Sequence, residues 1–386
     1  MNLPVVNKQR VYFLDNLKAF IILLMVVFHV AMGYTTWDLK WWTVNDVQKH
    51  SFFDLFILET DVYIMPIMFL VAGYFAPMVL LKRGISGFWQ GKLKRIVIPW
   101  VGGVLFIAPF VAYSTFYSRM DTPPNYFSFW ATGFWGPYYQ QAQYWFLGVL
   151  ALFFLLLTIA YQINPAYFKK SNQLATPSFW FFPAFALFTA ASFFIANLFF
   201  WNDAWVNVQF LFMLQPVRFI LHLCYFGLGV YAWKHFWFTP GGYNPRLLPW
   251  CMSALIMLFV FLAYRVTFTL MPDVPVVAKV GHALTHATFS LTATFALIAL
   301  FQRFFDSNAY LWRRLAANSY IIFFIHQCVI IPIGCAVQKM QINVWVKYLG
   351  VSLVTVLLCF LIAEYVITYL LSFGKQNPNT NTQLPK

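Results

Sequence analysis

Residues 10–34 read RVYFLDNLKAFIILLMVVFHVAMGY, an apolar helix with Asp15, Lys18 and His29 inside it. Lys18 and His29 are eleven residues apart, so at about 100° per residue their side chains share one face of the helix. The rise between them is about 16 Å, which puts Lys18 near one surface of a bilayer and His29 in the opposite leaflet. Ionisable residues inside a membrane are costly, and we therefore expect this helix to carry function.

The composition excludes a soluble globular protein. Hydrophobic residues make up 61% of the chain and charged residues only 9%, whereas soluble domains carry about 25% charged residues. Ten apolar segments have spanning length, at about 14–34, 54–81, 96–117, 144–163, 179–200, 208–233, 248–270, 280–302, 318–337 and 345–372. We predict an all-α polytopic integral membrane protein with about ten transmembrane helices.

The loops predict the orientation. The formal net charge is +14, and Lys and Arg concentrate in the loops on the side of the N-terminus. By the positive-inside rule both termini are cytoplasmic, in a cell inner (plasma) membrane. We expect a single transmembrane domain at residues 1–374 and a disordered polar tail at 375–386.

The second apolar segment carries acidic residues near its start. Glu59 and Asp61 are about 200° apart on a helix, so they cannot share a face. One of them could orient or charge-balance His29, as carboxylates commonly do for an imidazole. The alternative is that both are hydrated at the level of the lipid headgroups.

The loop after this segment is the most basic part of the chain. Residues 81–99 read LKRGISGFWQGKLKRIVIP. Clustered cations at a membrane surface bind anionic lipid or a polyanionic ligand. Arg95 can bind a phosphate through two parallel hydrogen bonds, whereas Lys92 offers a point charge. Taken singly, these residues can also serve only to fix the topology.

Other polar residues leave two interpretations each. The aromatic outer loop at residues 118–143, with its glutamines, is either an interfacial belt or a platform for sugar rings. Arg218 either pairs with a carboxylate from a neighbouring helix or binds the acceptor. His326 needs a partner at mid-membrane depth, and Glu364 is a candidate. His282 and His286 have the spacing of a metal pair but lack a third ligand, so we predict no metal.

Several motifs resemble the membrane acyltransferase 3 family. The order Leu14-Asp15, Lys18, ten further residues and His29 is similar to the family's opening helix. Residues 81–99 look like its paired-basic motif before a proline, with Lys92 where Arg is usual. Residues 144–147, Tyr-Trp-Phe-Leu, and residues 319–327, which end in His326-Gln327, resemble two further signatures.

The resemblance implies an enzyme that moves an acyl group, acetyl or succinyl, from cytoplasmic acyl-coenzyme A to a hydroxyl of an extracytoplasmic oligosaccharide or polysaccharide. It is closest to the branch that acylates periplasmic glucans. We expect no permanently bound cofactor and no nucleic-acid partner; membrane lipid surrounds the chain, and a homo-oligomer stays open. A glycan exporter or secondary transporter without acyl chemistry is the alternative, and it predicts inverted repeats, of which we find no convincing example.

The resemblance also implies roles for individual residues. His29 is the general base that deprotonates the acceptor hydroxyl, and Asp61 or Glu59 supports it. The phosphates of the donor are held by Lys18, Lys92 and Arg95, with Asp15 fixing the side chain of Lys18. The residues that bind the acceptor, or that support those residues from behind, are His326, Arg218, Trp145 and Tyr144. No Gly-x-Ser-x-Gly elbow is present, so a serine-bound acyl intermediate is not supported, and an acyl-His29 intermediate stays open.

Overall fold

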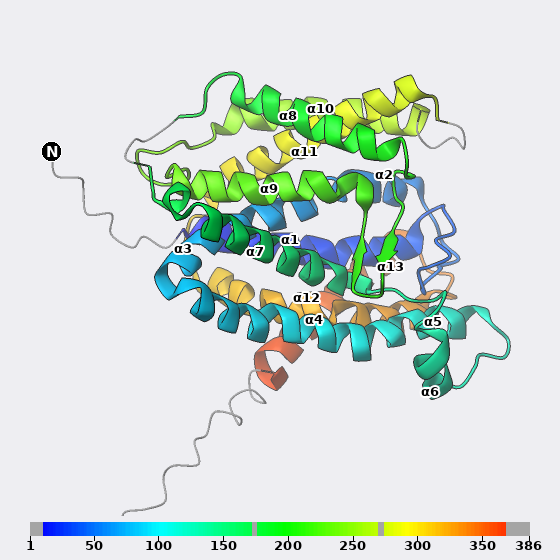
Figure 1. Cartoon of the computed structure of the whole chain (residues 1–386). Coiled ribbons are helices and arrows are strands. Elements are labelled where there is room, and N and C mark those ends of the chain that lie inside the picture. The colour runs from blue at the N-terminus through cyan, green and yellow to red at the C-terminus, as the bar shows by residue number, and fades with distance from the viewer. Residues whose placement is uncertain (1–10, 172–175, 269–273, 368–386) are drawn as a thin grey trace, which may run out of the picture.

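The computed structural model describes residues 11–171, 176–268 and 274–367. Helices dominate these residues and run back and forth along one common direction to form a bundle (Figure 1). Each of the ten predicted apolar segments contains at least one helix. Apart from one short β-hairpin, the all-α polytopic prediction is confirmed.

The α-helices and strands have the following bounds: α1 Tyr12–Ala31, α2 Ser51–Thr60, α3 Ile64–Lys92, α4 Ile98–Gly102, α5 Ala108–Arg119, α6 Tyr126–Ser128, α7 Trp145–Ile163, α8 Phe181–Asn197, β1 Val206–Val208, β2 Phe212–Leu214, α9 Pro216–Lys234, α10 Leu247–Phe268, α11 Val276–Phe304, α12 Tyr310–Val337 and α13 Val344–Leu361. Wider π-helical turns, Leu93–Val97 and Gly103–Ile107, link α3, α4 and α5, and a third, Ile362–Ile367, follows α13. We call the end of the bundle where α1 begins the proximal end, and the end where α1 finishes the distal end (Figure 1).

Seven stretches of the described residues are long and apolar enough to cross a membrane. One of them, Ser51–Arg119, is a continuous run through the second and third predicted segments. Helix α8 has 17 residues, fewer than a usual span, and α9 is not among the seven, yet both lie alongside the longer helices (Figure 1). The end of the last predicted segment and the predicted tail at 375–386 lie outside the described residues.

The chain reverses direction inside the long stretch at Gly84. Its φ of +66° and ψ of 176° belong to a region that only glycine adopts without strain. The basic residues on both sides of this corner therefore gather at the proximal end, where α3 finishes and the path toward α4 and α5 begins (Figure 1).

Two predicted segments are not continuous helices. The segment 54–81 breaks at a turn, residues 61–63, between α2 and α3. The segment 208–233 begins with a hairpin in which Val206 pairs with Leu214, and its helix starts only at Pro216. Gln209 and Phe210 have positive φ in the hairpin turn, and Pro216 occupies a first-turn position that suits proline. Residues 208–215 are apolar except for Gln209 and Gln215, and this hid the turn from the sequence pattern.

Helices α3 and α9 approach more closely than side chains would allow. A Cβ atom at Gly73 would lie 2.0 Å from the carbonyl oxygen of Phe226, and one at Gly229 would lie 2.1 Å from that of Leu70. Small residues permit such contact between membrane helices. Gly73 and Gly229 are therefore positions of close packing between α3 and α9.

Candidate active site

Two histidines from opposite ends of the sequence meet inside the bundle. The ring centroids of His29, close to the end of α1, and His326, in the middle of α12, are 4.9 Å apart, and Nε2 of His326 lies 3.3 Å from Nδ1 of His29. Each Nδ1 also faces a backbone carbonyl: that of His29 is 2.8 Å from the oxygen of Met25, and that of His326 is 2.7 Å from the oxygen of Phe323. His326 is fully buried, whereas His29 is partly exposed.

The two carbonyl oxygens decide which nitrogen carries hydrogen in each neutral ring. A carbonyl can only accept, so both Nδ1 atoms must donate. Nε2 of His326 is then an acceptor and shares the Nδ1–H of His29 with the Met25 oxygen. Nε2 of His29 keeps its lone pair, and within the described ranges no side chain or backbone group bonds to it. A neutral imidazole in this state can act as a general base.

Residues 35–50 close over this pair at the distal end, and Trp42 is the side chain that reaches it. The Trp42 ring centroid lies 5.7 Å from that of His29, and the side chain is buried. Val44 from the same loop fits between the turn that follows α1 and helix α12, because Cβ atoms at Gly33 and Gly334 would lie 2.9 Å and 2.7 Å from its methyl groups. The loop therefore packs tightly on the helices that carry both histidines.

A buried ion pair fastens the loop to α13. Lys347 Nζ lies 2.5 Å from Asp46 Oδ1, and both side chains are almost completely buried. Lys347 also donates to the Met340 carbonyl at 2.8 Å, and Asp46 accepts from the Gln48 backbone N–H at 2.7 Å. The pair holds the segment that contributes Trp42.

A cavity of about 250 Å³ opens beside the loop. Its lining is rich in hydroxyl, amide and cationic side chains: Thr43, Asn45, Val47, Ser118, Arg119, Gln338 and Lys339. Thr43 directly follows Trp42, so a polar recess adjoins the residue that covers His29.

The carboxylates predicted to support His29 bind elsewhere. Asp61 forms an ion pair with Arg218, whose guanidinium also lies 2.8 Å from Asp203. Glu59 accepts a hydrogen bond from the Thr60 hydroxyl at 2.7 Å. In the described chain neither carboxylate contacts His29, so neither orients its ring directly, and a charge-balancing role at longer range stays a prediction. The prediction that Arg218 pairs with a neighbouring carboxylate is confirmed, and its two terminal nitrogens bind Asp61 and Asp203.

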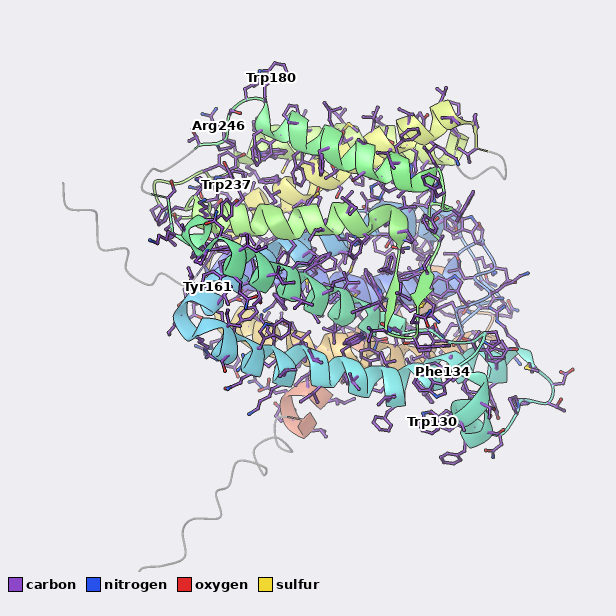
Figure 2. The ribbon with its side chains drawn as sticks, viewed as in Figure 1. Trp130, Phe134, Tyr161, Trp180, Trp237 and Arg246 are labelled. Carbon is purple, nitrogen blue, oxygen red and sulfur yellow. The ribbon has the colours of Figure 1, made fainter. Side chains whose placement is uncertain are left out.

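The predicted donor residues gather at the proximal end. Lys18 lies 3.9 Å from Asp15, at the limit of an ion pair, and its side chain is 36% exposed. Lys92 ends α3 and packs its ammonium 3.7 Å from the ring centroid of Phe154. Arg95 is exposed in the π-helical turn that follows. Arg246 lies at this end too, whereas Trp130 and Phe134 mark the other (Figure 2).

Tyr144 and Trp145, at the start of α7, take different positions. The Tyr144 hydroxyl donates to the Phe324 carbonyl at 2.6 Å, which ties α7 to α12 two residues before His326. The ring of Trp145 lies 5.1 Å from that of Trp205 and 6.0 Å from that of His222. Tyr144 thus supports the backbone beside the histidine pair, whereas Trp145 packs against Trp205 and His222.

Two other expectations need correction. Glu364 pairs with Arg314 at 2.5 Å and accepts from Asn318, so it is not the partner of His326. Gln141, in the predicted sugar platform, is buried and donates to the Leu211 carbonyl at 3.0 Å, so it is not free for sugars. Within the described residues no group of three or more His, Cys, Asp or Glu side chains could hold a metal ion.

The sequence pattern missed three parts of the site: Trp42, the Met25 carbonyl and the Asp46–Lys347 pair. No local signal marks them. Trp42 stands in an aromatic, polar loop like others in the chain, and a backbone carbonyl has no sequence signature. Asp46 and Lys347 are 301 residues apart and look like ordinary loop charges.

The bundle and its histidine pair, with a basic end about three helical turns away along α1, define a polytopic membrane enzyme with a candidate acid–base centre. A family model described as an acyltransferase domain matches residues 11–364. The chain therefore belongs to the acyltransferase 3 family and is a membrane acyltransferase, as its motifs suggested.

Curated relatives match only part of the chain. Glucans biosynthesis protein C of Escherichia coli strain SMS-3-5 is 32% identical over 94 residues, and that of strain K12 is 31% identical over the same length. Each alignment covers 24% of this chain and 24% of the relative, so the chain spans about a quarter of the length of the proteins it matches. No solved structure matches the chain significantly.

Proposed function

We propose that this acyltransferase moves an acetyl or succinyl group from acyl-coenzyme A, bound at the proximal end, to a hydroxyl of a glycan bound at the distal end. One observation carries the proposal: both Nδ1 atoms of the histidine pair lie within hydrogen-bond distance of a carbonyl oxygen, which leaves Nε2 of a neutral His29 with its lone pair on a side chain that is only partly buried. Lys18 stands on the same helix about 16 Å away along the axis. The arm of acyl-coenzyme A that carries the thioester can, when extended, bridge this distance between Lys18 and His29.

The charge distribution supports an orientation with the proximal end in the cytoplasm. The corner at Gly84 and the ends of α7, α9 and α11 bring most of the Lys and Arg residues to this end. Cytoplasmic loops carry such an excess. Both termini are then cytoplasmic, and the loop with Trp42 faces the extracytoplasmic side.

The proposed reaction needs one proton transfer and one bond exchange. Nε2 of His29 takes the proton of the glycan hydroxyl while that oxygen attacks the thioester carbonyl carbon. The carbon–sulfur bond then breaks, and the leaving thiolate takes the proton back from His29. The products are an ester and free coenzyme A, so the step consumes no other reactant.

Neighbours of His29 stabilise the charged ring during this transfer. An imidazolium donates stronger hydrogen bonds than a neutral ring, and its Nδ1–H already points between the Met25 carbonyl and Nε2 of His326. His326 is thus a positioning residue that acts through His29. Trp42 and the adjoining polar recess provide the surface at which an acceptor hydroxyl would arrive.

Three basic residues are proposed to hold the donor phosphates. Lys18 and Arg95 are accessible at the proximal end, and the ammonium of Lys92 is held in place by Phe154. For the acceptor, the names of the partial relatives favour a glucan.

Thermal unfolding of the purified protein with acetyl- or succinyl-coenzyme A tests the donor site. A ligand at about 100 times its dissociation constant adds roughly 2.7 kcal/mol to the folded state. We expect either thioester to raise the midpoint temperature of unfolding of the wild type, and to raise that of Arg95→Ala and of Lys18→Ala much less. The control Lys234→Ala, which removes a proximal cation packed on Tyr167, should keep the shift. No shift with either thioester would refute the proposed donor.

A further inference from the structure

The recess that adjoins Trp42 has a volume of about 250 Å³, and both charged side chains in its lining are cations. Arg119 is the last residue of α5, and Lys339 lies two residues beyond the end of α12. Both residues are exposed, so a ligand can reach them. The volume is just below the usual range of small-molecule pockets, about 300–1,000 Å³, so the recess suits one group of a larger ligand.

Arg119 keeps donors for such a ligand. Its guanidinium carries five N–H groups. One faces Asp38 at 3.4 Å, and two donate to the carbonyls of Leu39 and Trp42 at 3.0 Å, which leaves two. The pair with Asp38 is exposed on both sides, so it neutralises the charge of Arg119 only weakly.

Lys339 and Gln338 add further donors. Within the described ranges no group pairs with the ammonium of Lys339. The side-chain oxygen of Gln338 accepts from the Asn45 backbone N–H at 3.1 Å, so the amide group that remains to it is a donor. Donors and two positive charges match a ligand that only accepts hydrogen bonds, which is a carboxylate or a phosphate. A neutral sugar hydroxyl, which must also donate, gains less here.

Bonds between the loop and the end of α12 hold the recess in shape. The Val47 backbone N–H donates to the Gln338 carbonyl at 3.1 Å. Lys347, which pairs with Asp46 in the loop, also donates to the Met340 carbonyl at 2.8 Å. The residues on both sides of Lys339 are thereby fixed, and a preformed wall lowers the entropy lost when a ligand binds.

The cationic end of the recess is too far from the histidine pair to hold the acyl group itself. Gln338, the residue before Lys339, lies twelve residues beyond His326, a rise of about 18 Å on a helix. In a succinyl group only three C–C bonds of about 1.5 Å separate the thioester carbon from the carboxylate carbon. An anion bound there while transfer takes place at His29 therefore belongs to another part of the substrate.

We infer that this recess binds an acidic group, a carboxylate or a phosphate, of the glycan acceptor while a hydroxyl on another unit of the same chain reaches His29. The inference rests on the proposed function for its acceptor. Two linked contacts raise the apparent affinity for a chain that can make both. A preference for acidic over neutral acceptors is the consequence, and added salt should weaken it.

The test uses the intact detergent-purified protein and glucose oligosaccharides of one length, either neutral or carrying a single carboxylate or phosphate at carbon 6. We expect Lys339→Gln to raise the dissociation constant and the KM of both acidic oligosaccharides about 2- to 5-fold, the strength of one exposed charge contact. The values for the neutral oligosaccharide should change much less. Lys339→Arg should restore the wild-type values, because it keeps the charge.

The control is Lys49→Gln, which removes an exposed cation from the same loop outside the recess. It should leave all of these values unchanged. Lys339→Gln that binds acidic oligosaccharides as tightly as the wild type, or an equal effect of Lys49→Gln, would overturn the inference. A changed ratio of KM for succinyl- and acetyl-coenzyme A in Lys339→Gln, with acidic acceptors bound as before, would assign the recess to the acyl group and overturn it as well.

Direct binding separates this inference from the proposed function. Preferential binding of acidic oligosaccharides that Lys339→Gln weakens, in a protein that transfers no acyl group, would uphold the recess and refute the proposed function. Acyl transfer without any preference for acidic acceptors would refute the recess and leave the proposed function standing.

Discussion

The buried Asp46–Lys347 pair gives a prediction with a defined magnitude. In Lys347→Met, the carboxylate of Asp46 stays buried without its cation, and the carbonyls of Met340 and Val337 lose a donor at 2.8 Å and 3.4 Å. Removing one partner of a buried ion pair costs about 3–5 kcal/mol. Asp46 retains one backbone donor, the N–H of Gln48, so we expect the free energy of unfolding to fall by about 3 kcal/mol.

The assay is unfolding in mixed micelles, combined with the transfer rate at a temperature where the variant is folded. The double variant Asp46→Leu/Lys347→Met should recover most of the stability, because it leaves no uncompensated charge. Transfer should fall in the single variant even when folded, since the pair holds the loop that brings Trp42 to His29. If Lys347→Met lost less than about 1 kcal/mol in the free energy of unfolding and kept the wild-type rate of acyl transfer, the reasoning would be refuted.

Three further predictions concern the positioning histidine, the helix packing and the distal ion pairs. His326→Asn removes the imidazole that shares the Nδ1–H of His29, so kcat should fall about tenfold or more, less than the 10²–10⁴-fold expected for loss of the base, with donor KM unchanged in steady-state kinetics. Gly229→Ala places a Cβ 2.1 Å from the Leu70 carbonyl and should cost about 1–3 kcal/mol in unfolding measurements, whereas Gly227→Ala, with nothing within 4 Å, should be neutral or stabilising. Desolvation by the surrounding helices would raise the pKa of Asp203, but the guanidinium groups of Arg265 and Arg218 outweigh it and hold the pKa below its ordinary value of 3.8. A lowered folded-state pKa stabilises the protein above the unfolded value, and this stabilisation is lost as pH falls through the folded value. The unfolding midpoint should therefore drop as the pH falls below about 3.8, and drop less in Asp203→Asn.

Much of the fold could be predicted because the bilayer simplifies the pattern. Long apolar runs mark helices, and the basic loops mark one end, so the ten segments and their alternation follow from local composition. The close packing at Gly73 and Gly229 follows the general rule that close contact between membrane helices requires small residues. The hairpin before α9 could not be predicted, since its residues are as apolar as the helix that follows.

The candidate site was predictable only in part, because its partners are distant in sequence. The spacing of Lys18 and His29 is local and visible, whereas His29 and His326 are 297 residues apart. A carboxylate is the partner that general chemistry suggests for an imidazole, yet Asp61 forms its ion pair with Arg218. Only the packing of α1 against α12 reveals that a second histidine and a backbone carbonyl fix the His29 ring.

The most direct test of the central claim is the rate of acyl transfer from acyl-coenzyme A to a glucan acceptor by His29→Ala, at matched amounts of folded protein, beside His235→Ala at the proximal end. Loss of a general base lowers such a rate by about 10²–10⁴-fold, and we predict this loss for His29→Ala with acyl-coenzyme A binding retained and His235→Ala unaffected. Full transfer by folded His29→Ala would contradict the assignment of His29 as the base.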